Sequence, residues 1–254
     1  MRRLNEWSLK ARNGMVFPDY REFSRLTREA TLIPVVKPVM ADLLTPVSAF
    51  LAIAAGEPEA FLLESVERGE QVGRYTFLGT KPYMQVRARG REIEVRRGRR
   101  VGRKQGNVLE VLKKLLREHR PAILAGLPPF AAGAVGYFAY DSVRQLENIG
   151  RHAKDDRSLP DCGFMFFDRV LAFDHLRHQI QIIATADVSR ESPRKAYDRA
   201  LADIAALEKK LATGLRRERL KESPARAKGK LKIAPRRAPR AARTRSCAGW
   251  SNTP

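Results

Sequence analysis

Histidine is the side chain best suited to act as a base or a metal ligand at neutral pH, and the chain has four: His119, His152, His175 and His178. His175 and His178 lie three residues apart in a polar turn, and no third ligand is nearby in the sequence. A tetrahedral metal site needs at least three protein ligands, so this spacing does not indicate one. We interpret the histidines as solvated turn side chains rather than as catalytic groups.

The cysteines and glycines give no stronger sign of chemistry. Cys162 and Cys247 are far apart, and neither has a partner at the spacing of a zinc site or of a disulfide framework. Gly133, Gly136 and Tyr137 form a G-x-x-G pattern, which lacks the spacing of a phosphate-binding loop. We therefore predict that these glycines serve close packing of strands.

A carboxylate and a hydroxyl end one apolar segment. Residues 60 to 65 form an apolar run that finishes in Glu64-Ser65. In the stretch from Arg74 to Leu78, the aromatic residues Tyr75 and Phe77 occupy alternate positions. Both segments are typical of strands, separated by a polar turn. On composition alone, Glu64 and Ser65 simply terminate an edge strand, and an aromatic strand more often belongs to a core than to a ligand wall.

The remaining pattern predicts an α+β fold with mainly antiparallel β-sheets and flanking helices. Helical spacing of apolar residues predicts four helices, at residues 18–28, after Thr45-Pro46, at 107–120 and at 192–211. Alternating or continuous apolar runs predict further strands, at residues 84–88, 93–95, 131–140, 164–173 and 179–185. The run at 131–140 is so apolar that we expect a strand buried on both faces, with Asp141 capping a short helix after it.

The charge of the chain is concentrated at its end. The formal net charge is +21, and residues 209–254 hold 15 basic and 2 acidic residues, which leaves +13 in that stretch. We divide the chain into an extension at 1–14, one domain at 15–213 and a basic tail at 214–254. The tail has too few apolar residues to offset its ordering entropy, so we predict that it is disordered.

The sequence also indicates where the protein works. No stretch approaches the roughly 20 apolar residues that span a bilayer, and the basic start is not followed by the apolar core of a signal peptide. We therefore expect a cytoplasmic protein without a membrane partner.

Four blocks, in order, resemble anthranilate synthase component I, the large subunit of that enzyme. The most distinctive is FLLESVERGEQVGRYTFLGTKP, at residues 61–82. The others are LLTPVSAFL at 43–51, GAVGYFAYDSVRQLE at 133–147 and FMFFDRVLAFDH at 164–175. The resemblance covers about residues 15 to 213 and points to the amino-terminal domain of that family.

The resemblance implies a binding site for L-tryptophan, the feedback inhibitor of the family. In that family the Leu-Leu-Glu-Ser strand lines the tryptophan pocket, which here corresponds to Leu63, Glu64 and Ser65. Glu64 would balance the ammonium group, Ser65 would hydrogen-bond the ligand and Leu63 would face the indole ring. Tyr75 is a further candidate for the same pocket.

The resemblance also implies what the whole enzyme does. The family converts chorismate and ammonia into anthranilate and pyruvate with Mg²⁺, and a glutamine amidotransferase, component II, delivers the ammonia. We expect the chorismate pocket, the Mg²⁺ ligands and the catalytic residues to be missing from this chain, which would then need no cofactor of its own. Residues 236–254 depart from the family and resemble translation in a shifted reading frame, so we interpret the chain as truncated.

Two alternatives remain open. The large subunit of aminodeoxychorismate synthase, in the folate pathway, shares the fold and often a tryptophan site. The second alternative is a basic protein whose tail binds nucleic acid non-specifically. Five arginines, at positions 87, 89, 91, 96 and 97, would crowd the outer face of the hairpin at 84–95, but no aromatic residues are interleaved with them. We therefore expect a solvated strand face and no sequence-specific binding of nucleic acid.

Overall fold

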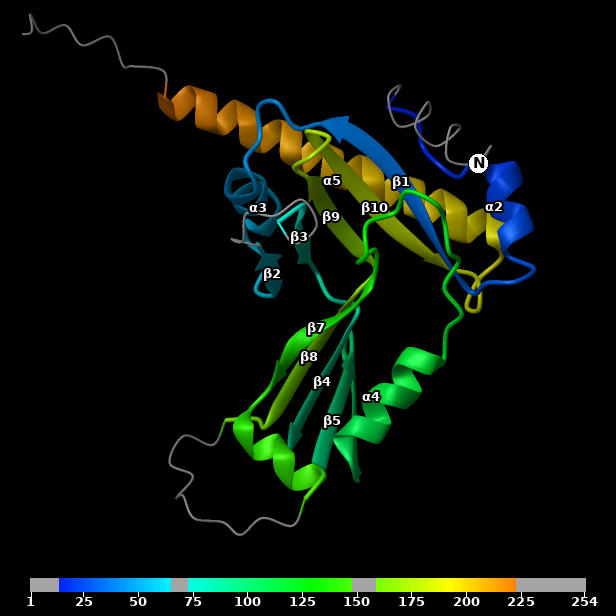
Figure 1. Ribbon diagram of the computed structural model, residues 1–254, viewed down its shortest axis with the longest axis vertical. Coiled ribbons are helices and arrows are strands. Elements are labelled where there is room, and N and C mark those ends of the chain that lie inside the picture. Colours follow the sequence, from blue (N-terminus) through cyan, green and yellow to red (C-terminus); the bar gives the residue numbers. More distant parts are fainter. Residues whose placement is uncertain (1–13, 65–72, 148–158, 223–254) are drawn as a thin grey trace, which may run out of the picture.

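The computed structural model describes residues 14–64, 73–147 and 159–222. It is an α+β structure with two five-stranded antiparallel sheets, which confirms the predicted fold class (Figure 1). The extension at 1–13 and the tail from 223 onward lie outside the described residues, so the expectations for them stay predictions. Within the described part of the chain, no helix is long and apolar enough to cross a membrane.

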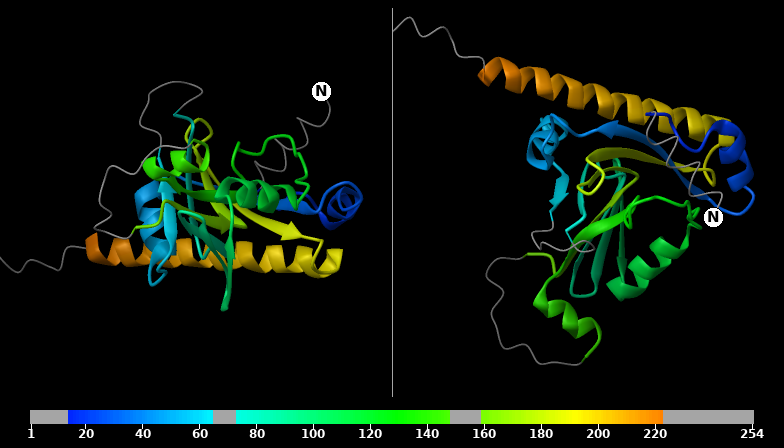
Figure 2. Two further views of the ribbon diagram at one scale, coloured as in Figure 1. Left: turned by 90° about the horizontal axis from the view of Figure 1, so that it is seen from below. Right: turned by 45° about the horizontal axis from the view of Figure 1, so that its top comes forward.

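The first sheet has the strand order β1-β10-β9-β3-β2. Its strands are β1 (Leu32–Met40), β10 (Gln179–Asp187), β9 (Arg169–Asp174), β3 (Tyr75–Thr80) and β2 (Ala60–Leu63). One face of this sheet carries three helices, α2 (Tyr20–Leu26), α3 (Pro46–Ala54) and α5 (Pro193–Glu222). Figure 2 shows α5 running along the whole sheet, with α3 beside one end of it and α2 beside the other.

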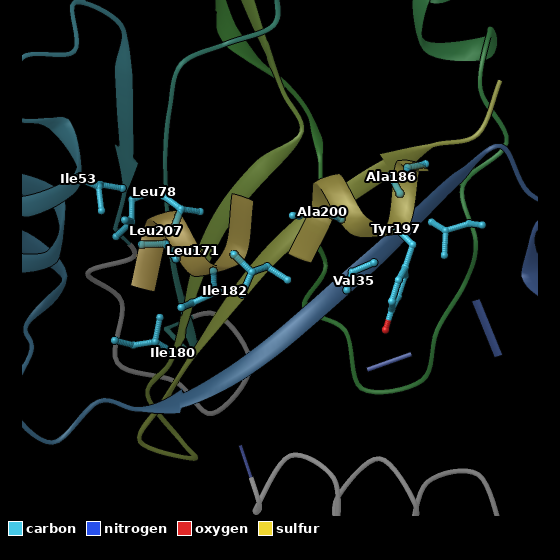
Figure 3. Close-up of a cluster of buried hydrophobic side chains, with 14 of the residues drawn as sticks. Val35, Ile53, Leu78, Leu171, Ile180, Ile182, Ala186, Tyr197, Ala200 and Leu207 are labelled. Atoms are coloured by element: carbon cyan, nitrogen blue, oxygen red, sulfur yellow. The ribbon is translucent and has the colours of Figure 1, made fainter. Parts of the chain in front are cut away.

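The largest core lies between α5 and the first sheet. Ala196, Ala200, Ile204 and Leu207 recur at helical spacing, so they point to one side of α5, where they meet buried side chains of β3, β9 and β10 (Figure 3). Tyr197 closes one end of this core, because its ring lies 4.9 Å from that of Phe23 and its hydroxyl donates to the Pro18 carbonyl at 3.0 Å.

Helix α5 is longer than the sequence pattern predicts. The expected end was residue 211, but the helix continues to Glu222, so the tail we predicted to be disordered from 214 begins as helix. Gly214 is not a stop signal: a Cβ there would collide with Ala52 of α3, so glycine allows the two helices to approach closely. The residues that follow are mainly Leu, Arg, Lys and Glu, all of which favour helix.

Strand β1 was not predicted, because Pro34 and Pro38 interrupt its apolar run. The strand is at the edge of the sheet and pairs over its whole length only with β10, so the missing N–H groups of the prolines disturb no ladder on the other side. The exceptions among the described residues are two isolated bridges, neither of which involves a proline of β1. Phe17 and Val36 exchange backbone hydrogen bonds of 2.9 and 2.7 Å, and Leu32 is bridged to Pro121.

The second sheet has the strand order β6-β5-β4-β8-β7. Its strands are β6 (Arg100–Gln105), β5 (Glu92–Arg97), β4 (Met84–Arg89), β8 (Cys162–Phe167) and β7 (Gly133–Phe138). Helix α4 (Val108–Arg117) packs the apolar residues Val108, Val111, Leu112 and Leu115 against it. The predicted cap is confirmed, since the Asn107 side chain accepts from the Leu109 N–H at 2.9 Å.

One apolar run serves both sheets. The stretch 164–173, expected as a single strand, belongs to β8 in the second sheet up to Phe167 and to β9 in the first sheet from Arg169. Asp168 is the point of crossing, and its carbonyl accepts from the Thr185 N–H of β10 at 2.7 Å. The run contains no glycine or proline to mark this crossing, which is why its pattern is typical of one strand.

Strand β7 corrects two expectations. It is an edge strand and not buried on both faces, since Tyr137 and Phe138 are about half exposed. Asp141 does not cap the helix that follows, the 3-10 helix η1 (Tyr140–Gln145); it lies inside it and pairs with Arg144 at 3.0 Å. The packing role of Gly136 is supported, because a Cβ there would collide with the backbone of β8.

Candidate ligand-binding site at the end of β2

The candidate site residues share one face of the first sheet. Leu63, the last residue of β2, is paired with Phe77 of β3, so both side chains point to the same face. Tyr75 is two residues before Phe77 and therefore points to that face too, and the two rings stack with centroids 5.8 Å apart. An aromatic surface thus lies beside the end of β2.

Leu63 and Glu64 are both solvent-exposed, and the Leu63 side chain is 48% exposed. Ser65 lies outside the described residues. The structure therefore brings Leu63 and Tyr75 to one side of the sheet, while the polar groups expected to hold a ligand are accessible from solvent or undescribed. Leu63, Glu64 and Tyr75 do not line the cavity described below.

A buried ion pair supports the aromatic surface. Asp174 is paired with Tyr75 across the strands, and its carboxylate, fully shielded from solvent, accepts from Arg74 Nε at 3.0 Å and Nη2 at 2.7 Å. The Arg74 guanidinium also lies 4.8 Å from the centre of the Tyr75 ring, a favourable cation–π distance. These contacts fix both side chains next to the end of β2.

The ionisation of this cluster follows from its contacts. Burial raises the pKa of Asp174, but the hydrogen bonds and charge of Arg74, with a smaller contribution from Arg177, outweigh burial and hold the pKa below its ordinary value. The hydrogen bond to Asp174 in turn raises the pKa of Arg74. Burial, followed by the charge of Asp174, raises the pKa of Tyr75. The site therefore keeps an ion pair and a neutral phenol at physiological pH.

Two glutamines on the same face were missed by the sequence reasoning. Gln179 is paired with Asp174, and Gln181 with Ala172, which places both on the face of Tyr75 and Phe77. Gln181 is fully buried, and neither atom of its amide has a hydrogen-bond partner among the described residues; Gln179 Oε1 is buried and unpaired as well. Their alternation in an otherwise apolar strand was the available signal.

This arrangement suits binding rather than bond-breaking chemistry. His175, next to Asp174 in the chain, has its Nε2 2.8 Å from the hydroxyl of Thr76, which lies on the opposite face of β3 from Tyr75. Cys162 is buried in the second sheet, where burial raises the pKa of its thiol to about 11, so the thiolate is scarce at neutral pH. Among the described residues, no group of three or more His, Cys, Asp or Glu is placed to hold a metal ion.

Comparison with known proteins identifies the family. A family model described as "chorismate binding enzyme" matches residues 58–236. The chain belongs to the chorismate-binding enzyme family. This match includes β2, β3 and all of the second sheet, so the expectation that the chorismate-binding region lies wholly outside the chain is not supported.

Two curated relatives with the same name are similar to this chain. "Anthranilate synthase component 1" of Acetivibrio thermocellus is 36% identical over 198 residues, which are 78% of this chain and 40% of that protein. The protein of the same name from Synechocystis sp. is 37% identical over 180 residues, 70% of this chain and 35% of that protein. The chain therefore spans about two fifths of the length of these relatives.

A solved structure is also similar. Anthranilate synthase component I from Streptococcus pneumoniae aligns with 71% of this chain and 36% of its own chain, at 22% sequence identity and a TM-score of 0.43.

Proposed function

We propose that this chain is the tryptophan-sensing part of an anthranilate synthase component I, acting in tryptophan biosynthesis. The observation that carries the proposal is the pairing of β2 with β3, which sets Leu63 beside the stacked rings of Tyr75 and Phe77. The names of the curated relatives favour this enzyme over aminodeoxychorismate synthase.

The chemistry of L-tryptophan matches this surface in two ways. Its indole needs an apolar wall, which Leu63 and the two aromatic rings supply, and its ammonium needs a carboxylate, which Glu64 supplies at the strand end. Ser65 follows directly and would hydrogen-bond the carboxylate or the ammonium of the amino acid. Arg74 and Asp174 position Tyr75 and do not themselves contact the ligand.

Calorimetric titration of the full chain with L-tryptophan tests the proposal. We expect one saturable site, weakened about tenfold to a hundredfold by Glu64→Ala, because a charge-assisted hydrogen bond contributes about 1.5–3 kcal/mol. Glu29→Ala is the matched control, since Glu29 is an exposed glutamate before β1, and it should bind as the wild type does. Equal affinities of the wild type and Glu64→Ala would remove Glu64 from the site.

The family match supports a second candidate function, binding of chorismate by this chain itself. Titration with chorismate in the presence of Mg²⁺ tests it, and a saturable heat would establish it.

We further propose that formation of anthranilate, and association with the glutamine amidotransferase component II, belong to the full-length enzyme. A fluorescence assay for anthranilate from chorismate, ammonium and Mg²⁺ should therefore show no turnover by this chain, and turnover would contradict that assignment.

A further inference from the structure

A second site lies at the junction of the two sheets, away from the end of β2. The structure has a cavity of about 480 Å³ there, within the range of natural small-molecule pockets. Most of its walls are apolar and come from β1, from α4, from the segment 121–133 and from the end of β8; they include Leu32, Pro34, Leu115, Pro128, Phe166 and Phe167.

The segment 120–122 holds one wall in place by pairing with β1. The Thr31 N–H donates to the Arg120 carbonyl at 2.8 Å, and the Ala122 N–H donates to the Leu32 carbonyl at 2.8 Å. The Thr31 hydroxyl accepts from the Arg120 N–H at 2.8 Å. These bonds form an isolated bridge at the start of β1, so backbone hydrogen bonds tie this side of the cavity to the first sheet.

Two polar side chains line the cavity without partners. Thr185 of β10 is 7% exposed, and its Oγ1 is buried with no hydrogen-bond partner among the described residues. His119, at the end of α4, has a buried Nδ1 that likewise has none. A buried polar atom left unpaired costs about 1–3 kcal/mol. These two atoms are therefore available to hydrogen-bond a molecule in the cavity.

The charge of the lining narrows the class of ligand. No lysine or arginine is among the described residues that line the cavity, whereas Asp168 is, and its carboxylate already accepts from Arg169 Nε at 3.1 Å. A carboxylate placed there would be desolvated without a cation to balance it. The lining thus disfavours dicarboxylates such as chorismate.

We propose that this cavity binds a compact neutral molecule with an aromatic or alicyclic ring and one hydroxyl group. The ring fills the space between the leucine, proline and phenylalanine side chains, and the hydroxyl pairs with Thr185 Oγ1. The proposal does not depend on tryptophan binding, because Leu63, Glu64 and Tyr75 do not line this cavity.

Fluorescence titration with 2-naphthol and with naphthalene, which lacks the hydroxyl, tests the proposal on the full chain. We expect 2-naphthol to bind at one site, and Thr185→Val, which keeps the side-chain shape, to weaken it roughly tenfold while leaving naphthalene unchanged. Thr213→Val is the control, because Thr213 is an exposed threonine of α5, and it should leave both affinities unchanged.

A second variant tests, by steric blocking, whether the probes bind in this cavity. Ala132→Leu places a larger side chain at the cavity wall and should abolish binding of both probes, while the melting temperature confirms that the variant is folded. The proposal is overturned if 2-naphthol does not bind saturably, or if Thr185→Val and Ala132→Leu both bind it as tightly as the wild type. L-tryptophan titrated into the same variants should bind normally, which separates failure of this site from failure of the tryptophan site.

Discussion

The two sheets have the same number of strands but differ in how much of each is buried. The first sheet is covered by helices on one face and by the second sheet and the segment 121–133 on the other, so nearly every residue of β10 is buried. In the described part of the chain, helix α4 packs on one face of the second sheet (Figure 2). Every residue of β6 is exposed. Both candidate sites involve the first sheet, where unpaired polar side chains lie in a buried setting.

The outer face of the second sheet is charged but partly neutralised. Glu94 lies across from Arg87 and Arg103 in the strand pairings, and its carboxylate contacts Arg96 at 3.2 Å and Arg103 at 3.4 Å. The face therefore has the character of a solvated strand surface, as the sequence predicted. Arg97 is an exception to that prediction, because it turns toward α4 and approaches Glu118 at 3.7 Å.

The largest contrast between the sheets should appear when apolar side chains are truncated. Leu171 of β9 is fully buried under α5, so Leu171→Ala should lower the free energy of unfolding by about 3 kcal/mol through lost contacts and a cavity. Val101 of β6 is 48% exposed, so Val101→Ala should change the free energy of unfolding by less than about 0.5 kcal/mol. Urea unfolding measures the free energy of unfolding of both variants. Equal losses would contradict the expected difference between the two sheets.

Removing a carboxylate should give the next largest difference. Asp174→Ala leaves Arg74 partly buried without its partner, and because Arg74 is 26% exposed we expect a loss of about 2 kcal/mol, below the full cost of breaking a buried pair. Glu94→Ala removes the acceptor of two exposed arginines and should not measurably change stability. The same urea experiment compares them, and a larger loss for Glu94→Ala would contradict the prediction.

The ion pair also predicts a pH dependence. Because the pKa of Asp174 is lower in the folded chain than in the unfolded one, its stabilisation is present above the unfolded pKa of about 3.9 and is lost as the pH falls through the folded pKa. The difference in stability between the wild type and Asp174→Asn should therefore shrink below about pH 4. If this difference in stability grew on acidification instead, the pKa of Asp174 would be raised in the folded chain.

A smaller contrast is expected between two glycines. Gly214→Ala puts a methyl group against Ala52 and should separate α5 from α3, at a cost of about 1–2 kcal/mol. In β6, a Cβ at Gly102 would meet its nearest neighbour, the Val95 carbonyl, at an ordinary 3.8 Å, so Gly102→Ala should be tolerated. Thermal unfolding of the two variants checks this, and equal melting temperatures would mean that α5 does not need the close contact.

The elements that the sequence predicted well are those with a local signal. Helix α4 has an amphipathic pattern and an asparagine cap, and the hairpin of β4 and β5 alternates around a glycine turn. Strand β1 was missed because the tolerance of an edge strand for proline depends on its neighbours. The crossing at Asp168 was missed because it depends on which sheet each half of an apolar run joins.

The candidate site was also predictable only in part, because its contacts join residues that are far apart in the sequence. Leu63, Glu64 and Tyr75 came from a family resemblance, and the structure adds that Leu63 and Tyr75 share a face. The partner of Arg74 is 100 residues away in the chain, so no local pattern indicates Asp174. The unpaired amide of Gln181 becomes meaningful only when β10 is placed beside β9 and its neighbours are known.

Hydrogen exchange of the full chain with and without L-tryptophan tests the central proposal most directly. Binding at the end of β2 should slow exchange in residues 60–64 and 75–77 and leave β4, β5 and β6 unchanged, with L-alanine as the control ligand. Slowed exchange confined to the second sheet, or none at a concentration of L-tryptophan that saturates the full-length enzyme, would contradict the proposed sensing role.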